Sequence, residues 1–367
     1  MTALCVTSLG VSLALALVLV PLARREFRRR GFVDRPGARK IHGAPMPYGG
    51  GVAVFATVAV VLGAGIAVAR FSGAPWLAWL PGGDVLRTHA DGILLRARDL
   101  GWLLVLAAGL AVMGQVDDRR GLGALPKLAA QVVAAAVVVW LLGIQATFFV
   151  PVAWVGQVAT VLWIVAVTNA FNFLDNMDGL SGGVAAIVLA VLVAVTLASG
   201  QIFVPVLALV LLGAVVGFLV YNFPPASVFL GDAGSQPLGF LVAVLTVLAN
   251  YYRGAPGEGA FGPFMPLVLL AVPLYDLLSV TAIRLARGKS PFVGDTNHFS
   301  HRLVALGLSR RAAVLIVYLA TVATALGALV LRKATTVEAV FVFVQTVCIL
   351  AIIAVFERIA GERAQKE

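Results

Sequence analysis

The chain has few charged residues and almost no cysteine. Only 12% of its 367 residues are Asp, Glu, Lys or Arg, while 61% are hydrophobic, and a soluble domain cannot hide that much apolar surface in one core. Cys5 and Cys348 lie far apart, so neither a disulfide framework nor a thiolate metal site is expected. The formal charge of +10 comes without a basic stripe interleaved with aromatic residues, which disfavours nucleic-acid binding.

Eleven apolar runs predict an all-α, polytopic integral membrane protein that forms a single domain over residues 1–367. No positive residue precedes the first run and five arginines follow it, the reverse of a signal peptide, so an uncleaved helix with an external N-terminus is expected. The runs are 6–23, 49–69, 100–116, 125–143, 155–172, 182–199, 203–222, 235–252, 264–283, 312–331 and 337–355.

The distribution of Lys and Arg supports this threading. It places the C-terminus and the loops near 24–48, 117–124, 173–181, 223–234 and 284–311 in the cytoplasm. Those segments, with Lys127, hold 20 of the 27 Lys and Arg residues, as the positive-inside rule requires. Every polar cluster described below falls on this same side, which favours one shared site.

The most informative cluster lies between Thr168 and Gly183, where three Asn and two Asp separate two apolar runs. On a continuous helix, Asn169, Asn172 and Asn176 would share a face, with Asp175 and Asp178 beside it. Carboxylates at a bilayer edge are costly, so a metal ion or a phosphate-bearing substrate is expected as their partner. The alternative is a polar network satisfied by neighbouring helices.

Two further clusters carry acids. Asp117 and Asp118 are adjacent at the predicted cytoplasmic end of the third span, where a cation between them would relieve their repulsion. Their alternative is a solvated helix end with arginine counter-ions. Asp232 lies in the Gly-bracketed turn Phe229-Leu-Gly-Asp-Ala-Gly-Ser235, which suits either close approach to an anion or an ordinary helix cap.

Basic groups form the last two clusters. His298, His301 and Arg302 follow one another in a late loop, where they can donate to phosphate oxygens or be incidental. Lys40 lies in a basic first loop that can also act as a membrane anchor. Mg²⁺ prefers oxygen ligands, so the whole inventory favours phosphoryl transfer between a soluble nucleotide-linked donor and a membrane-resident acceptor.

These motifs resemble those of the polyprenyl-phosphate N-acetylhexosamine-1-phosphate transferases, of the glycosyltransferase family 4 type. The resemblance runs from about residue 30 to residue 310. It rests on Asp117-Asp118 with Lys127 downstream, Asn-Ala-Phe-Asn-Phe-Leu-Asp-Asn-Met-Asp-Gly-Leu180, Phe-Leu-Gly-Asp-Ala-Gly-Ser235 and His-x-x-His-Arg302. The opening Val-Asp-Arg-Pro-Gly-Ala-Arg-Lys-Ile-His42 and the eleven spans are more similar to the undecaprenyl-phosphate N-acetylglucosaminyl-1-phosphate transferase branch than to the phospho-N-acetylmuramoyl-pentapeptide transferase branch.

The resemblance implies transfer of a sugar 1-phosphate, most consistent with N-acetylglucosamine 1-phosphate, from a UDP-sugar to undecaprenyl phosphate with release of UMP. It implies a requirement for Mg²⁺ or Mn²⁺, a bacterial cytoplasmic membrane and a cytoplasmic active site where a cell-surface glycan is started. The partners would be a UDP-N-acetylhexosamine, undecaprenyl phosphate and membrane lipids, and a homodimer is compatible with it.

By motif, the resemblance also implies roles for individual residues. Catalytic roles fall on Asp117, Asp118, Asp175 and Asp178; metal binding on Asp232, Asp175 and Asp118; and substrate binding on Lys40, Asn172, His298, His301 and Arg302. Two departures stand out. Asn176 occupies a position where Gly is frequent, and the late loop has fewer histidines than the denser cluster of the family.

Three other interpretations remain open on the sequence alone. One is the muramoyl-pentapeptide branch. The second is an ion-coupled secondary transporter, although transporter acids typically lie near the membrane midplane in repeated, broken helices, whereas these acids collect at one surface. The third is a catalytically inactive scaffold. Direct attack by the lipid phosphate is favoured over a covalent aspartyl intermediate, but both remain open.

Overall fold

The computed structural model describes residues 1–35, 45–79, 83–146, 152–249, 251, 261–290 and 298–364, and these are almost entirely helical. The helices are α1 Thr2–Arg29, α2 Gly50–Ala69, α3 Gly83–Arg120, α4 Ala124–Ala136, α5 Ala153–Leu174, α6 Leu180–Ala198, α7 Phe203–Asn222, α8 Asp232–Leu248, α9 Met265–Leu269, α10 Ala271–Ala286, α11 Phe299–Ala305, α12 Arg310–Leu331 and α13 Thr336–Ala364. Short 3₁₀ turns cover Pro75–Trp79 and Gly262–Phe264, a π-turn at Val137–Leu141 extends α4, and the strands β1 Val33–Asp34 and β2 Met46–Pro47 pair antiparallel.

Each of the eleven predicted apolar runs contains a helix that covers most of its described residues. Within those residues, nine helices are long and apolar enough to cross a membrane, or ten if the bent pair Gly262–Leu269 and Ala271–Ala286 is one span. The remaining run corresponds to α8, which has 17 residues. The bend of 61° in the pair lies just before Pro273, which has no N–H for the carbonyl of Leu269. The prediction of an all-α, polytopic membrane protein is confirmed.

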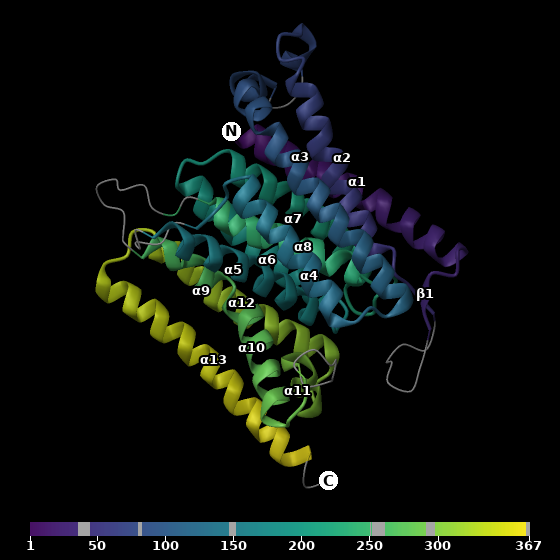
Figure 1. Cartoon of the computed structure of the whole chain (residues 1–367), viewed down its shortest axis with the longest axis vertical. Coiled ribbons are helices and arrows are strands. Elements are labelled where there is room, and N and C mark those ends of the chain that lie inside the picture. Colours follow the sequence, from purple (N-terminus) through teal and green to yellow (C-terminus); the bar gives the residue numbers. More distant parts are fainter. Residues whose placement is uncertain are drawn as a thin grey trace.

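One boundary prediction was wrong. Helix α3 has 38 residues and begins at Gly83, not near residue 100. Such a helix is about 57 Å long, while the hydrocarbon core is about 30 Å thick. Its first half therefore continues beyond the apolar layer, at the upper tip of Figure 1. Hydropathy marks only the apolar half, because charged residues such as Arg96 and Asp99 end an apolar run without ending a helix.

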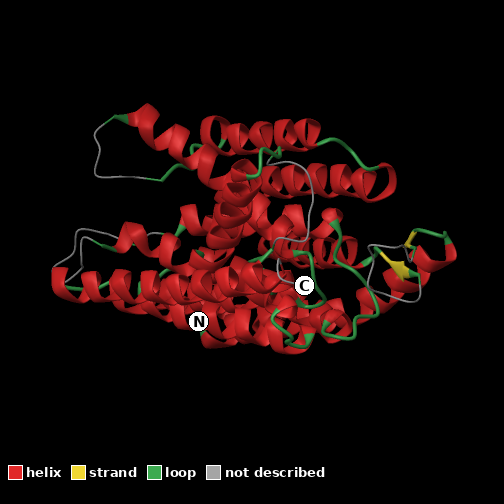
Figure 2. Ribbon diagram, turned by 90° about the horizontal axis from the view of Figure 1, so that it is seen from below, coloured by secondary structure: helices red, strands yellow, loops and turns green. Residues whose placement is uncertain are grey.

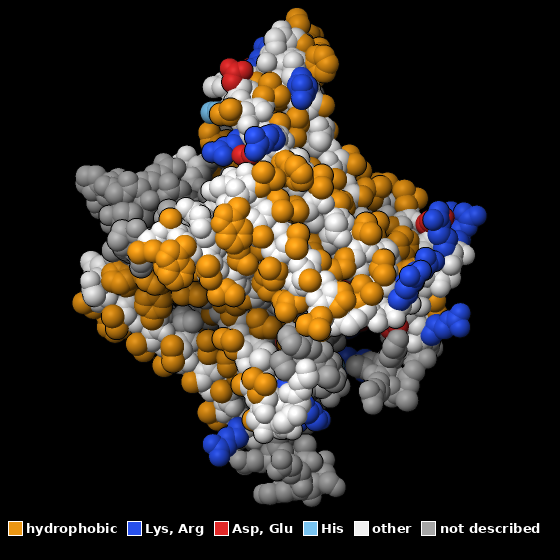
Figure 3. Space-filling view, viewed as in Figure 1, with side chains coloured by type: hydrophobic (Ala, Val, Ile, Leu, Met, Phe, Trp, Pro, Cys, Tyr) orange, Lys and Arg blue, Asp and Glu red, His pale blue; other side chains and the backbone are white. Residues whose placement is uncertain are grey.

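The centre of the bundle is formed by α6 and α7. In their most apolar windows 72% and 67% of residues are buried, against 17% in α1 and 22% in α13. Figure 1 shows α13 along one margin of the bundle, and Figure 2 shows the helices stacked in layers. The visible surface is a broad hydrophobic area between ends at which Lys and Arg gather (Figure 3). Lipid-facing apolar side chains explain why the sequence is hydrophobic far beyond what its core needs.

At two glycines, α2 and α3 pack against the start of α8 at backbone distance. A Cβ on Gly51 of α2 would fall on the backbone of Gly234, and a Cβ on Gly114 of α3 would fall on the backbone of Asp232. Small residues allow membrane helices to approach at backbone distance. The end of α3, with its two acids, therefore lies directly against the N-terminus of α8.

Candidate active site

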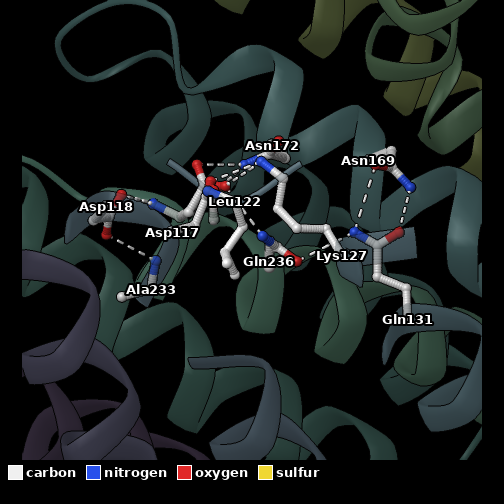
Figure 4. A network of polar contacts seen from close by, with 11 residues as sticks. Asp117, Asp118, Leu122, Lys127, Gln131, Asn169, Asn172, Ala233 and Gln236 are labelled. Carbon is white, nitrogen blue, oxygen red and sulfur yellow. Dashed lines mark hydrogen bonds and ion pairs between the residues drawn. The ribbon is translucent and has the colours of Figure 1, made fainter. Parts of the chain in front are cut away.

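The candidate site lies where α3 ends, α4 begins, α5 ends and α8 begins. Figure 4 shows acids, amides and one lysine from these four helices pointing toward one another. Three of the motifs singled out in the sequence meet here, although they are separated by up to 114 residues. The predicted gathering of distant polar clusters is therefore present for Asp117, Asp118, Asn172 and Asp232.

Asp118 holds the N-terminus of α8. Its carboxylate oxygens accept the backbone N–H groups of Asp232 at 3.0 Å and Ala233 at 3.2 Å. These N–H groups have no partner within their own helix, and a carboxylate there is also favoured by the helix dipole. Gly231, just before the helix, has φ of +68°, and a Cβ on it would lie 2.7 Å from Asp118 Oδ2.

Lys127 joins two of the acids. Its Nζ lies 2.7 Å from Oδ2 of Asp117 and 3.1 Å from Oδ2 of Asp232. The other oxygen of Asp117 accepts the backbone N–H of Leu122 at 2.5 Å. The lysine is the first-turn residue of α4 that follows Pro126, so the short loop after α3 returns a cation to the acids at the end of α3.

Side-chain amides also donate hydrogen bonds to the carboxylate of Asp232. Asn172 Nδ2 donates to Asp232 Oδ1 and to Ser235 Oγ, both at 2.9 Å. Gln236 Nε2 donates to Asp232 Oδ2 at 3.1 Å. Gln131 continues the network, because its Nε2 donates to Gln236 Oε1 at 3.2 Å and its Oε1 accepts Nδ2 of Asn169 at 2.6 Å.

The two glutamines were missed by the sequence reasoning. Each is a lone amide inside an apolar helix, and both are buried, with exposed fractions of 2% for Gln131 and 0% for Gln236. A buried amide must be hydrogen-bonded. This rule predicts a hydrogen-bond partner for each glutamine. Pairing the two glutamines would have indicated that α4 contacts α8.

The expectation that Asn169, Asn172 and Asn176 share a helix face was wrong for Asn176. Helix α5 ends at Leu174, and Asn176 lies in the turn that follows, where its Nδ2 donates to the Phe173 carbonyl at 2.6 Å. Side chains of Asn and Asp compete for backbone groups and so favour helix ends. Gly179, with φ of +77°, is the residue just before α6, and glycine adopts this left-handed conformation without steric cost.

Asp175 and Asp178 therefore lie in the turn between α5 and α6. Asp178 Oδ2 accepts the backbone N–H of Ala226 at 3.0 Å, which ties this turn to the loop before α8. Burial, followed by the charges of Asp232 and Asp118, raises the pKa of the Asp175 carboxyl well above its usual value. Burial disfavours the charged form of a carboxyl, and the neighbouring acids add to this effect.

These carboxylate and amide oxygens are suitable ligands for a divalent cation. In this structure the ammonium group of Lys127 lies between Asp117 and Asp232. Of the four acids here, Asp117 and Asp232 pair with Lys127, while Asp118 accepts backbone N–H groups and Asp175 is buried near Asp232 and Asp118. Carboxylate oxygens are the ligands that Mg²⁺ prefers. Within the part of the chain that the structure describes, no three His, Cys, Asp or Glu side chains already converge on a metal position. The excess negative charge and the raised pKa of Asp175 both indicate that a cation would be stabilised.

The late His/Arg cluster lies beside this centre, against Phe173. The ring of His298 packs edge-to-face on Phe173 with centroids 5.3 Å apart, and His301 is 6.4 Å from His298. Ser300 Oγ donates to Asn176 Oδ1 at 2.6 Å, which fastens α11 to the turn after α5. Arg302 donates to Ser279 Oγ at 2.9 Å.

Two residues complete the comparison with the sequence. Asp276 lies inside a run predicted to be apolar, and the sequence reasoning did not single it out. Its Oδ2 lies 2.9 Å from Nδ1 of His298. Lys40 lies outside the described residues.

Comparison with known proteins gives consistent relatives. The sequence profile described as "Glycosyl transferase family 4" matches residues 100–250, which include all four acids of the centre. A probable undecaprenyl-phosphate N-acetylglucosaminyl 1-phosphate transferase of Bacillus subtilis is 32% identical over 96% of this chain and 92% of that protein.

Two further relatives have names of the same kind. A decaprenyl-phosphate N-acetylglucosaminephosphotransferase of Mycobacterium tuberculosis is 33% identical over 82% of this chain and 76% of its own length. An undecaprenyl-phosphate alpha-N-acetylglucosaminyl 1-phosphate transferase of Escherichia coli is 27% identical over 84% and 78%. With near full-length similarity and with its acids gathered at one centre, the chain belongs to glycosyl transferase family 4, among the polyprenyl-phosphate N-acetylhexosamine-1-phosphate transferases.

Proposed function

We propose that this protein transfers N-acetylglucosamine 1-phosphate from UDP-N-acetylglucosamine to undecaprenyl phosphate, releasing UMP. The observation that carries the proposal is the contact of Lys127 with both Asp117 and Asp232. It brings the end of α3 and the start of α8 into one charged centre at the end of an apolar bundle. A centre of this kind suits the meeting of a soluble, charged donor with a lipid-borne phosphate.

In the proposed reaction, an oxygen of the lipid phosphate attacks the β-phosphorus of the UDP-sugar. The bond from that phosphorus to the bridging oxygen breaks, UMP leaves with that oxygen, and a diphosphate joins lipid and sugar. A phosphate monoester has a second pKa of about 6, so the acceptor is already mostly ionised at neutral pH. Asp117, fixed by Lys127 and the Leu122 N–H, would therefore contribute alignment more than deprotonation.

The other residues have complementary roles. Asp232, Asp175 and Asp118 would hold Mg²⁺, which when bound neutralises charge on the phosphates. Asn172 orients Asp232 through its 2.9 Å hydrogen bond, and Asp178 fixes the turn that carries Asp175. His298, His301 and Arg302 would donate to the diphosphate of the donor, and Lys40 would join them. Asn172 and Phe173 are consecutive residues of α5. The first donates to Asp232 and the second packs against His298, so the histidine cluster lies near the acids.

We further infer a bacterial cytoplasmic membrane location with the centre on the cytoplasmic side. The start of α1 and the end of α13 lie on opposite sides of the bundle in Figure 1, as expected for an odd number of spans. The ends of α3 and α5 and the start of α8 share one end of the bundle. UDP-sugars are cytoplasmic metabolites, and the excess of Lys and Arg lies in the loops predicted on that side.

The test is release of UMP by the purified full-length protein given labelled UDP-N-acetylglucosamine, Mg²⁺ and undecaprenyl phosphate. Asp232→Asn should reduce turnover by at least about 100-fold, the size seen when a group that stabilises transition-state charge is removed. Asp99→Asn is the matched control, since that acid pairs with Arg96 in the first half of α3, away from the acids at the end of the helix, and it should keep wild-type turnover.

The alternatives predict other outcomes. Preference for a UDP-muramoyl-pentapeptide donor would assign the protein to the other branch. No UMP release from any UDP-sugar, together with ion-coupled uptake in vesicles, would reject the enzyme and favour a transporter.

A further inference from the structure

A buried carboxylate in α10 has no role in the reaction as described so far. Asp276 has an exposed fraction of 0%. Both of its oxygens are engaged by the late histidine segment: Oδ2 lies 2.9 Å from Nδ1 of His298, and Oδ1 accepts the backbone N–H of Phe299 at 2.8 Å. An ionised carboxylate away from water is costly unless such partners compensate it.

This double contact fixes both the backbone and the ring of His298. The bond to Phe299 sets the first residue of α11, and the bond to Nδ1 sets the rotation of the imidazole. His298 is itself only 7% exposed, and its ring meets Phe173 at an interplanar angle of 89°. Since Nδ1 is held by Asp276, the second ring nitrogen, Nε2, points away from Asp276.

Phe173 connects this histidine to the acids. It follows Asn172, which donates to Asp232, and it precedes Asp175 by two residues. Among the described residues, Asp276 of α10 and His301 of α11, with ring centroids 6.4 Å apart, face the ring of His298. The guanidinium of Arg284 lies 5.0 Å from the centroid of the Phe173 ring, on which His298 packs.

We propose that Asp276 is a positioning residue that keeps the proton of His298 on Nδ1 and so presents Nε2 toward the donor's diphosphate. The proposal rests on the proposed function, in which His298 contacts a nucleoside diphosphate sugar. Diphosphate oxygens only accept hydrogen bonds, so Nε2 must carry a proton as well when the donor is bound. Asp276 Oδ2, 2.9 Å from Nδ1, is placed to accept the other ring proton.

The competing explanation is purely structural, with Asp276 only fastening α10 to α11. The two explanations differ in kinetics. A positioning residue acts through His298 on donor binding, so its loss should raise the KM for UDP-N-acetylglucosamine and leave the KM for undecaprenyl phosphate unchanged. A structural loss lowers the amount of active enzyme and leaves both KM values unchanged.

The experiment is a double-mutant cycle on the full-length protein with Asp276→Asn, His298→Gln and both together. Asp276→Asn keeps an oxygen for the Phe299 N–H but removes the charge. We expect it to raise the donor KM by about tenfold, or about 1.4 kcal/mol, with kcat little changed. The double variant should have the donor KM of His298→Gln alone. Thr321→Val, which removes a buried hydroxyl bonded within α12, is the control and should leave both KM values unchanged.

An unchanged donor KM in Asp276→Asn, or losses that add in the double variant, would overturn the positioning role. A measurement on the unaltered protein covers the case in which Asp276→Asn does not fold. The chain has four histidines, and ¹⁵N labelling with His298→Gln for assignment reports which nitrogen of His298 carries the proton. A protonated Nδ1 supports the proposal, and an unprotonated Nδ1 refutes it. This result does not depend on turnover, so wild-type protein that releases no UMP would refute the proposed function separately.

Discussion

Lys127→Met isolates the electrostatics of the candidate site, because methionine keeps much of the aliphatic stem and removes the charge. The Nζ lies 2.7 and 3.1 Å from two carboxylate oxygens. At an effective dielectric constant of about 20, each contact contributes an attraction of about 5 to 6 kcal/mol before desolvation is subtracted.

Most of that attraction is cancelled by desolvation, so the measured loss is smaller. Removing one partner of a buried pair costs about 3 to 5 kcal/mol. The side chain of Lys127 is 23% exposed and those of Asp117 and Asp232 are 12% and 22% exposed, so the lower end, about 3 kcal/mol, applies. The variant should be less stable in EDTA, and Mg²⁺ should restore more stability to it than to the wild type, because the variant lacks the ammonium group that pairs with Asp117 and Asp232.

Unfolding in mixed micelles can be followed by the fluorescence of the six tryptophans, with and without Mg²⁺. Lys333→Met, at an exposed lysine in the turn between α12 and α13, is the matched control and should change neither curve. If Lys127→Met were as stable as this control, or if Mg²⁺ stabilised both equally, the lysine would not be compensating the acids.

Three further predictions follow from other contacts. Gly51→Ala should destabilise the protein and reduce activity, because the new Cβ would fall on the Gly234 backbone. Gly63→Ala is the control and should do neither, since nothing lies within 4 Å of its Cβ. Thermal unfolding and turnover measurements distinguish the two variants. The pKa of Asp175 is raised above 3.8, so its contribution to stability is present at low pH and is lost as pH rises through the raised pKa. Mg²⁺ competes with that proton, so stabilisation by Mg²⁺ should grow as pH rises toward neutrality, and Asp175→Asn should flatten this dependence; a pH-independent Mg²⁺ effect in the wild type would contradict it. With Cys5 and Cys348 replaced, a cysteine at the exposed Arg120 should react with an impermeant reagent only from the cytoplasmic side and one at Trp79 only from outside; the reverse pattern would reject the threading.

Much of the fold was predictable because the bilayer imposes one rule on every span. Apolar runs of about 20 residues must form helices in lipid, and each of the eleven runs does so. Helix ends in water follow other rules. Helix α3 extends back to Gly83 through charged residues, and α5 stops at Leu174 because Asp175 and Asn176 can bond to the backbone outside a helix.

The candidate site was predictable where polar residues are conspicuous. Asp117, Asp118 and Asp232 stand out because they are acids in polar or glycine-rich segments between apolar runs. Gln131 and Asp276 were missed because each lies inside a predicted apolar run, away from the other acids and amides. Their partners, Gln236 and His298, lie in other helices, and nothing local in the sequence states which helices will touch.

The contacts of Asp118 and Asp276 share a principle that no single motif contains. Each is a carboxylate from one helix that accepts the first backbone N–H of another: Asp118 at α8, 114 residues away, and Asp276 at α11, 23 residues away. Each helix so fixed begins at or beside a group proposed to meet the substrates, namely Asp232 and His298. Helix starts leave N–H groups unsatisfied, so a carboxylate from a neighbouring helix both satisfies them and sets where the next side chain lies. Short motifs therefore identify these candidate groups, while their placement depends on acids supplied by other helices.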